Sequence, residues 1–271
     1  MILGLIFLLI SICGSLSVYF GLGLYSNWYY FYAIPVGIIL DYLALIIVYI
    51  IGLFIVSLFF NKKKDIKKPS LFLYKLIRQT VQMINFFARV KIHTRGLELL
   101  PDGPYLMVTN HVSMFDPMVA IDKVKKQTLI CVTKPENENI PICGPFIHKA
   151  GFIAVDRENN KNGLKAIIKA ISFITEYKTS IYICPEGKRS KTGEMLPFHA
   201  GSFKIATKAN VPIVVASVKN AELIHKHFPF RITHVYFEIV KVINKEEYEN
   251  KKTEELAQQA FELIKENMER K

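Results

Sequence analysis

Two long apolar runs open the chain. Residues 1–25 contain no charged side chain, and residues 42–60 form a second uncharged stretch. A helix needs about 20 predominantly apolar residues to cross the hydrocarbon core of a bilayer. Between the runs, the aromatic cluster at residues 28–32 has the composition that settles at the headgroup level of a membrane. The pattern therefore predicts a transmembrane helical hairpin over residues 1–60.

Asp41 is the charged residue that interrupts this apolar pattern. A charged side chain at the bilayer centre costs about 2.5–3.5 kcal/mol on insertion scales, so we expect Asp41 near the outer interface, at the start of the second crossing. A cleaved signal peptide is the alternative interpretation. It is disfavoured because no basic segment precedes the first run, and because the second run would still retain the chain in the membrane.

Residues 61–90 contain a lysine-rich stretch followed by a segment that mixes polar and apolar residues. Five lysines lie within residues 62–68, directly after the second apolar run, and basic residues beside a membrane segment remain on the cytoplasmic side. Residues 69–90 then show polar positions recurring every three or four residues among apolar ones, which is the periodicity of a helix. We predict a basic linker followed by an amphipathic helix that either lies in the membrane interface or packs under the next domain.

From residue 91 to residue 271, short β-branched or aromatic runs alternate with helical patterns. This alternation is typical of one α/β domain with a mostly parallel central sheet flanked by helices. The predicted strands are 90–95, 105–109, 128–132, 152–155, 180–184, 212–218 and 232–240. The predicted helices are 117–124, 162–178, 200–208 and 252–269.

The charge of the chain is divided unevenly. All 35 basic residues lie in residues 61–271, which carry 22 acidic residues and a net charge of +13. A cationic domain beside an apolar anchor favours a membrane surface over nucleic acid as its partner, because each juxtamembrane cation gains about 1 kcal/mol near anionic lipid. We therefore predict an integral protein of the cell membrane whose α/β domain lies on the cytoplasmic side.

The four cysteines, at positions 13, 131, 143 and 184, show neither a Cys-x-x-Cys pair nor a spacing typical of metal ligands. We interpret them as buried free thiols. Free thiols fit a reducing, cytoplasmic setting.

Four predicted strands end in reactive or cationic residues. In open α/β sheets ligands bind outside the carboxyl ends of the strands, so we expect these clusters to form a single site. The clusters are Asn110-His111 after strand 105–109, Thr133-Lys134 after 128–132, Asp156-Arg157 after 152–155, and residues 185–190 after 180–184.

His111 and Asp116 lie five residues apart, across a turn between a strand and a helix. A carboxylate bonded to one ring nitrogen fixes the tautomer, so the other nitrogen can accept a proton from a substrate hydroxyl. The alternative is a buried histidine beside a helix-capping aspartate. Ser113 is disfavoured as a hydrolase nucleophile because it lacks the Gly-x-Ser-x-Gly elbow. No metal site is predicted, because no further His or Cys follows at ligand spacing.

These clusters resemble the motifs of the glycerolipid acyltransferases typified by 1-acyl-sn-glycerol-3-phosphate acyltransferase, over roughly residues 85–220. The His-x-x-x-x-Asp block matches at His111 and Asp116. The other matches are Gly151, Phe152 and Arg157 for Gly-Phe-x-x-x-x-Arg, residues 185–190 for Pro-Glu-Gly-x-Arg-Ser, and residues 211–215 for the fourth, hydrophobic block. Lys188 is a departure, because the family commonly has Thr there, and it adds a charge beside the expected phosphate site.

The resemblance implies that His111 is the general base and Asp116 its orienting partner. The residues it implies for binding the glycerol phosphate of the acceptor are Lys134, Arg157, Glu186, Gly187, Lys188 and Arg189. It implies that an acyl group moves from acyl-CoA or acyl-carrier protein, as substrate, to the sn-2 hydroxyl of 1-acyl-glycerol 3-phosphate, giving phosphatidic acid without a further cofactor. Two alternatives remain open: another lysophospholipid or glycerol 3-phosphate as acceptor, and a non-catalytic, membrane-tethered protein that binds anionic lipids.

Overall fold

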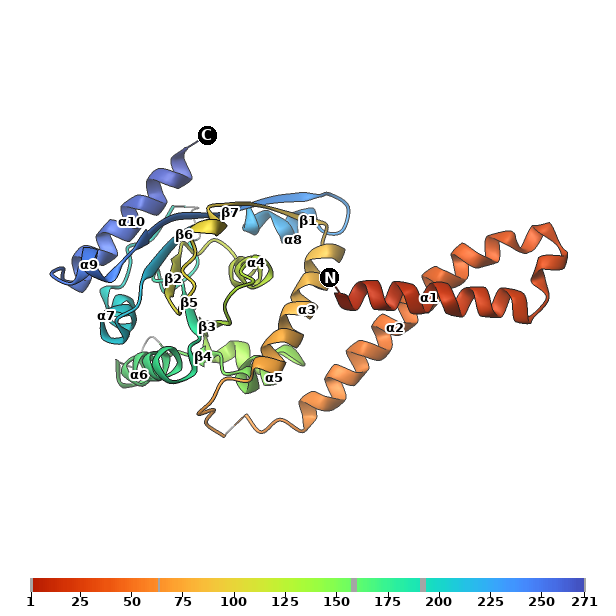
Figure 1. Cartoon of the computed structure of the whole chain (residues 1–271), viewed down its shortest axis with the longest axis horizontal. Coiled ribbons are helices and arrows are strands. Elements are labelled where there is room, and N and C mark those ends of the chain that lie inside the picture. Colours follow the sequence, from red (N-terminus) through yellow and green to blue (C-terminus); the bar gives the residue numbers. More distant parts are fainter. Residues whose placement is uncertain (1, 63, 157–159, 191–193, 271) are drawn as a thin grey trace. The chain divides into compact units, whose positions relative to one another are not determined.

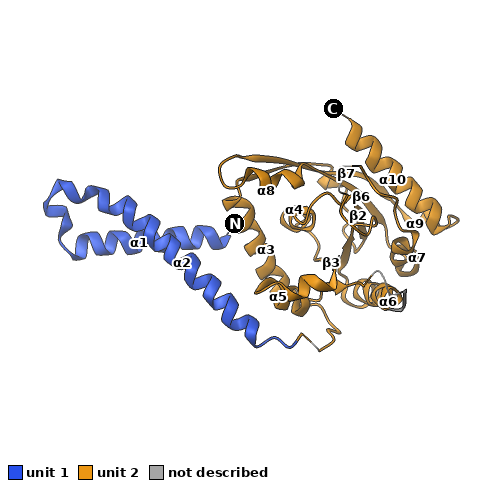
Figure 2. Cartoon of the chain, turned by 180° about the vertical axis from the view of Figure 1, so that it is seen from behind, with its two compact units in different colours: residues 1–61 blue, residues 62–271 orange. Residues whose placement is uncertain are grey.

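The computed structural model describes residues 2–62, 64–156, 160–190 and 194–270. The chain divides into two compact units, residues 1–61 and residues 62–271 (Figure 2). Each unit has its own internal packing and is described by itself.

The first unit is a helical hairpin. Helix α1 (Ile2–Gly21) and helix α2 (Ala33–Leu58) are joined by two short 3₁₀ turns, η1 (Leu24–Ser26) and η2 (Trp28–Tyr32). By length and composition, α1 and the segment Trp28–Leu58 are both apolar enough to cross a membrane. Most of their large apolar side chains are exposed, which is the reverse of the pattern in a water-soluble helix pair.

Asp41 lies inside α2 rather than at its start. The helix begins earlier than predicted because Pro35 falls in the first turn, where its missing N–H costs nothing. Ser15 Oγ donates a hydrogen bond to Asp41 Oδ2 at 3.0 Å. A Cβ on Gly37 would approach Ser15 Oγ to 2.9 Å, so glycine is needed for the close approach of the two helices. The hydrogen bond offsets part of the cost of an acid in apolar surroundings.

The second unit is built on a seven-stranded sheet of order β1-β7-β6-β2-β5-β3-β4 (Figure 1). All seven predicted strands are confirmed, and the sheet is parallel except that β7 runs antiparallel to β6. The strands are β1 (Val90–Arg95), β2 (Leu106–Thr109), β3 (Leu129–Thr133), β4 (Ile153–Ala154), β5 (Ser180–Ile183), β6 (Ile213–Lys219) and β7 (Thr233–Ile243).

Helices cover both faces of this sheet. Figure 1 shows α3, α4 and α5 together on one side and α6, α7 and α10 on the other. The helices are α3 (Leu71–Phe87), α4 (Asp116–Lys123), α5 (Cys143–Ala150), α6 (Asn160–Tyr177), α7 (Lys204–Ala209), α8 (Ile224–His227), α9 (Lys245–Tyr248) and α10 (Thr253–Glu269). The short 3₁₀ turns are η3 (Leu97–Leu99), η4 (Pro135–Asn139), η5 (Ala200–Phe203) and η6 (Ala221–Leu223).

The five helices predicted in this unit are present, and α5, α8 and α9 were not predicted. Predicted helix 200–208 divides into η5 and α7. Helix α5 contains Gly144 and Pro145, residues that usually interrupt helices, but they lie in its first turn, where Pro is tolerated. Helices α8 and α9 span four residues each, too few to show a helical period.

The central strands β2 and β5 are buried at every position, because both faces of the sheet are covered. Strands β2, β5, β3 and β4 are neighbours and all parallel. Their carboxyl ends therefore meet at one edge of the sheet, here called the catalytic edge.

Helix α3 packs on the domain through one face. Its residues Tyr74, Val81 and Asn85 are buried, and Asn85 Nδ2 donates to Asp122 Oδ2 of α4 at 3.0 Å. Leu71, Phe72, Ile84, Phe86 and Phe87 of α3 remain exposed. One of the two expectations for this helix was that it packs under the domain, and this holds for one of its faces. Another, apolar face of α3 remains uncovered.

Candidate active site

His111 follows β2 and Asp116 begins α4, as predicted. Asp116 Oδ2 accepts three hydrogen bonds, from His111 Nδ1 at 2.9 Å, Val112 N at 2.9 Å and Ser113 N at 2.8 Å. The carboxylate is fully buried, whereas the His111 side chain is 18 % exposed. Asp116 thus holds the imidazole by Nδ1 and leaves Nε2 as the nitrogen available to a substrate.

The segment 185–190 lies directly against His111. Glu186 Oε1 accepts a hydrogen bond from His111 N at 2.6 Å, and Ser190 N donates to His111 O at 3.3 Å. Glu186 Oε2 accepts from Leu196 N at 2.9 Å. Glu186 is buried, and both of its carboxylate oxygens accept hydrogen bonds from backbone N–H groups. Its role as a ligand of the acceptor stays a prediction.

Asn110, part of the first predicted cluster but given no role from the sequence, is a structural element of the site. Its side chain is fully buried and pairs with the backbone of β6: Asn110 Nδ2 donates to Val218 O at 2.9 Å, and Val218 N donates to Asn110 Oδ1 at 2.8 Å. The amide thereby continues the β2–β6 pairing beyond the end of β2. Because His111 is the next residue, this pairing fixes the position of the backbone from which the imidazole side chain extends.

Three of the predicted cationic residues are described, and they follow neighbouring strands at the catalytic edge. Lys188 and Arg189 are exposed after β5, and Lys134 is exposed after β3, the neighbour of β5. Gly187 has φ 79°, a left-handed conformation that glycine adopts without strain, and it allows the sharp turn that aims the following residues. Arg157 lies outside the described residues. Its predicted role stays a prediction.

Cys184 is the residue that sequence reasoning missed. It directly follows β5 and precedes Pro185, and its Sγ lies 3.4 Å from Thr109 Oγ1. Candidate ligand atoms of His111, Asp116 and Cys184 all lie within 4.8 Å of one another. Its position directly before the Pro-Glu-Gly block is visible in the sequence, but its approach to His111 is not. The interpretation of all four cysteines as buried is wrong for Cys13 and Cys143, which are exposed.

This trio is also the donor set that a metal ion would need. The sequence has no further Cys or His at ligand spacing beside the pair, but the fold brings Cys184 to it from β5. However, His111 Nδ1 is already bonded to Asp116 Oδ2, which in turn holds two backbone N–H groups. As arranged, His111 and Asp116 form a hydrogen-bonded pair, and Cys184 lies close beside it.

The electrostatics of the site favour a charged imidazole. Burial alone would lower the pKa of His111, but Cys184 and the carboxylate of Asp116 raise this pKa well above its ordinary value of 6.5. Burial raises the pKa of Asp116, while the hydrogen bond from His111 acts in the opposite direction. The pair therefore stabilises the imidazolium that forms when His111 accepts a proton.

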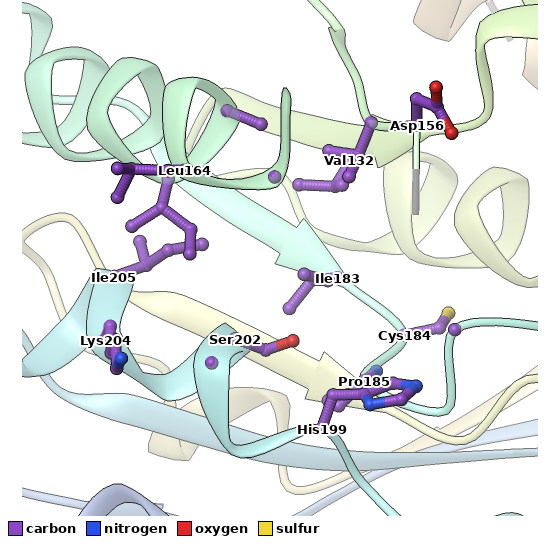
Figure 3. Close-up of a pocket in the computed structure, with 16 residues that line it drawn as sticks. Val132, Asp156, Leu164, Ile183, Cys184, Pro185, His199, Ser202, Lys204 and Ile205 are labelled. Atoms are coloured by element: carbon purple, nitrogen blue, oxygen red, sulfur yellow. The ribbon is translucent and has the colours of Figure 1, made fainter. Parts of the chain in front are cut away.

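A cavity of about 390 Å³ lies beside residues 183–187, between β5, α6 and α7. Figure 3 shows its lining, in which Val132, Leu164, Ile183 and Ile205 provide apolar walls. The polar residues among its lining include Asp156, His199, Ser202 and Lys204. An apolar cavity that reaches Cys184, next to the His–Asp pair, has room for a hydrocarbon chain.

A helix-covered, mostly parallel sheet that presents a His–Asp pair and a Pro-Glu-Gly-Lys-Arg-Ser loop at one edge has the architecture of a glycerolipid acyltransferase domain. Residues 91–219 match the family model described as Acyltransferase. This part of the chain is thus similar to the acyltransferases typified by 1-acyl-sn-glycerol-3-phosphate acyltransferase.

Relatives in yeast and in a bacterium carry that name. The 1-acyl-sn-glycerol-3-phosphate acyltransferase of Saccharomyces cerevisiae is 28 % identical over 167 residues, which are 60 % of this chain and 55 % of the relative. The protein of the same name from Helicobacter pylori is 29 % identical over 173 residues, 64 % of this chain and 68 % of the relative. The chain matches about half the length of the yeast relative and of the human enzyme named alpha.

A solved structure shares the fold. The crystal structure of the 1-acyl-sn-glycerophosphate (LPA) acyltransferase from Thermotoga maritima superimposes with a TM-score of 0.59. It is 23 % identical in sequence, and the match covers 72 % of this chain and 78 % of that one. The predicted fold class, a mostly parallel sheet flanked by helices, is confirmed.

Proposed function

We propose that this chain transfers a fatty acyl group from acyl-CoA or acyl-carrier protein to the sn-2 hydroxyl of 1-acyl-glycerol 3-phosphate, giving phosphatidic acid in phospholipid synthesis. The observation that carries the proposal is the bond of 2.9 Å between His111 Nδ1 and buried Asp116 Oδ2, beside the loop that bears Lys188 and Arg189. The names of the relatives support the same activity.

The chemistry requires one base and two aligned substrates. His111 accepts the proton of the acceptor hydroxyl while the oxygen of that hydroxyl attacks the carbonyl carbon of the thioester. The C–S bond then breaks, and the imidazolium returns the proton to the leaving thiolate. Asp116 stabilises the imidazolium between these two transfers. Holding both substrates at one edge of the sheet supplies the advantage of proximity.

The exposed cations of the catalytic edge suit a phosphate-bearing acceptor. Arg189 offers a planar fork that matches phosphate oxygens, and Lys188 and Lys134 act as point charges. Lys188 stands where the family commonly has Thr, which adds a positive charge beside the expected phosphate. This charge favours an acceptor with a doubly ionised phosphate over a zwitterionic lysophospholipid. The apolar cavity beside residues 183–187 would accommodate an acyl chain.

The domain organisation that we propose places this chemistry at a membrane. Residues 1–60 form a transmembrane hairpin, residues 61–90 a basic linker and amphipathic helix, and residues 91–271 a cytoplasmic catalytic domain of a cell-membrane protein. The support is the exposure of the apolar side chains of α1 and α2, which requires an apolar solvent, and the lysines after α2.

The test uses the purified full-length chain in nanodiscs. Oleoyl-CoA and oleoyl-acyl-carrier protein are each combined with 1-acyl-glycerol 3-phosphate, glycerol 3-phosphate or lysophosphatidylcholine, while released thiol and lipid product are followed. We expect phosphatidic acid with the first acceptor and the highest kcat/KM for it. Binding of anionic lipid without turnover of any thioester would overturn the proposal and favour the membrane-tethered lipid-binding alternative.

The pH dependence of this activity reports on Cys184. Because His111 must lose its proton to act as a base, kcat/KM should rise with pH through the raised pKa of His111, above 6.5. Cys184→Ala removes one of the groups that raise this pKa, so the ascending limb should move to lower pH. Cys143→Ala, at an exposed thiol, serves as the matched control. A Cys184→Ala profile that coincides with the wild type would show that the thiol does not influence the base.

A further inference from the structure

The sheet topology places two distant segments at the catalytic edge. Strand β7 runs antiparallel to β6, with Lys219 opposite Tyr236, so β7 begins where β6 ends. Asn110, bonded to Val218, puts His111 at that same end of β6. Strand β1 pairs in parallel with β7 from their first residues. The residues that precede β1 and β7 therefore lie at the edge that carries His111.

Those residues are apolar and exposed. Phe86 and Phe87 end α3 before β1, and Phe228, Phe230 and Ile232 precede β7. These five residues are here called the edge patch. Phe230 is 84 % exposed, an extreme value for a large apolar side chain in water.

Backbone and side-chain contacts join the two halves of the edge patch. Arg89 Nη1 donates to Phe230 O at 3.0 Å, and Thr233 N donates to Arg89 O at 3.1 Å. Figures 1 and 2 both show α8, which leads into the second half, beside the C-terminal end of α3. The edge patch is thus one surface feature of the second unit.

Exposed cations surround the edge patch. Arg89, Lys91, Lys226 and Arg231 are all exposed and lie within four residues of its members. Aromatic side chains bordered by Lys and Arg are the composition of segments that enter the headgroup region of an anionic bilayer. Such cations are attracted to the surface of an anionic bilayer.

We propose that the edge patch docks on an anionic bilayer and holds the catalytic edge against the lipid headgroups. The inference rests on the proposed membrane anchoring, because the hairpin of the same chain keeps a bilayer within reach. A second copy of the chain fits less well as the occupant, since it would bring the two sets of cations together in domains of net charge +13. Docking would let a lipid acceptor meet His111 without leaving the membrane.

The test exploits the single tryptophan of the chain, Trp28. In a Trp28→Phe background, Phe230→Trp places the only tryptophan in the edge patch, where high exposure makes the substitution tolerable. Leu99→Trp in the same background is the matched control, because Leu99 is exposed and follows the opposite end of β1. Each full-length variant is reconstituted in phosphatidylglycerol nanodiscs with and without bromine on the acyl chains.

We expect brominated lipid to quench the fluorescence of Phe230→Trp at least twofold and that of Leu99→Trp hardly at all. Equal and weak quenching of both variants would overturn the inference. So would a Phe230→Trp emission maximum that shifts with protein concentration but not with lipid, which would identify a second copy as the occupant. The wild-type protein tests the anchoring separately. Unquenched Trp28 would refute insertion of the hairpin in the bilayer. Quenched Trp28 together with an unquenched Phe230→Trp variant would refute only the docking of the edge patch.

Discussion

Replacing His111 by alanine should lower kcat/KM for acyl transfer by about 10²- to 10⁴-fold, the range typical for loss of a general base. The reason is that His111 is the imidazole held by a buried carboxylate at the catalytic edge. The measurement is steady-state release of free thiol from oleoyl-CoA with 1-acyl-glycerol 3-phosphate. Thermal unfolding of the same variant checks that the domain is still folded, because the substitution also takes one of three hydrogen bonds from buried Asp116.

A second histidine provides the matched control. His148 Nδ1 lies 3.1 Å from Glu138 Oε1, so it too forms a His–carboxylate pair, but one that joins α5 to η4. His148→Ala should keep kcat/KM within a few-fold of the wild type. If His111→Ala retained full activity, the assignment of the base would be wrong, whatever the outcome for His148.

Asp116→Asn should produce the second-largest loss, also about 10²- to 10⁴-fold in kcat/KM. All three hydrogen bonds of Asp116 go to Oδ2, so an amide oxygen at that position could still hold His111 Nδ1 and the two backbone N–H groups. The variant therefore keeps the ring orientation and removes the negative charge. Without that charge, the imidazolium formed during proton transfer loses its stabilising partner, and the pKa of His111 falls.

The same variant should be less stable. Asp116 Oδ1 is buried and has no hydrogen-bond partner among the residues the structure describes, so the amide NH₂ of Asn would occupy an unsatisfied position. We expect a loss of about 1–3 kcal/mol in the free energy of unfolding, measured by urea denaturation.

Asp122→Asn separates stability from catalysis. Asp122 is another buried carboxylate of α4, and it accepts hydrogen bonds from Gln82 and Asn85 of α3. Its replacement should destabilise the domain while leaving kcat/KM close to that of the wild type. An Asp116→Asn variant no less active than Asp122→Asn would contradict a catalytic role for the charge of Asp116.

Much of the fold was predictable because its signals are local. The seven strands appear as short β-branched or aromatic runs, and the long helices appear as apolar residues at helical spacing. The helices α8 and α9 escaped prediction because four residues carry no period. Helix α5 escaped because Gly144 and Pro145 resemble an interruption until their place in the first turn is known.

The part of the candidate site that rests on local signals was also predictable. His111 and Asp116 are five residues apart, so one turn brings them together, and the resemblance to a family supplied the other motifs. Cys184 could not be found in this way. Its approach to His111 depends on the parallel pairing of β5 with β2, which no local pattern displays.

The sequence by itself determined the apolar hairpin, the alternating domain and the His–Asp pair, because each arises from residues within a few turns of one another. Only the tertiary structure decided which strands are neighbours, that Glu186 and Asn110 brace the backbone around His111, and that the edge patch lies at the catalytic edge. These features require pairing between segments far apart in the chain. Such pairing is set by the burial of whole strands and by their register, not by the residues of any one segment.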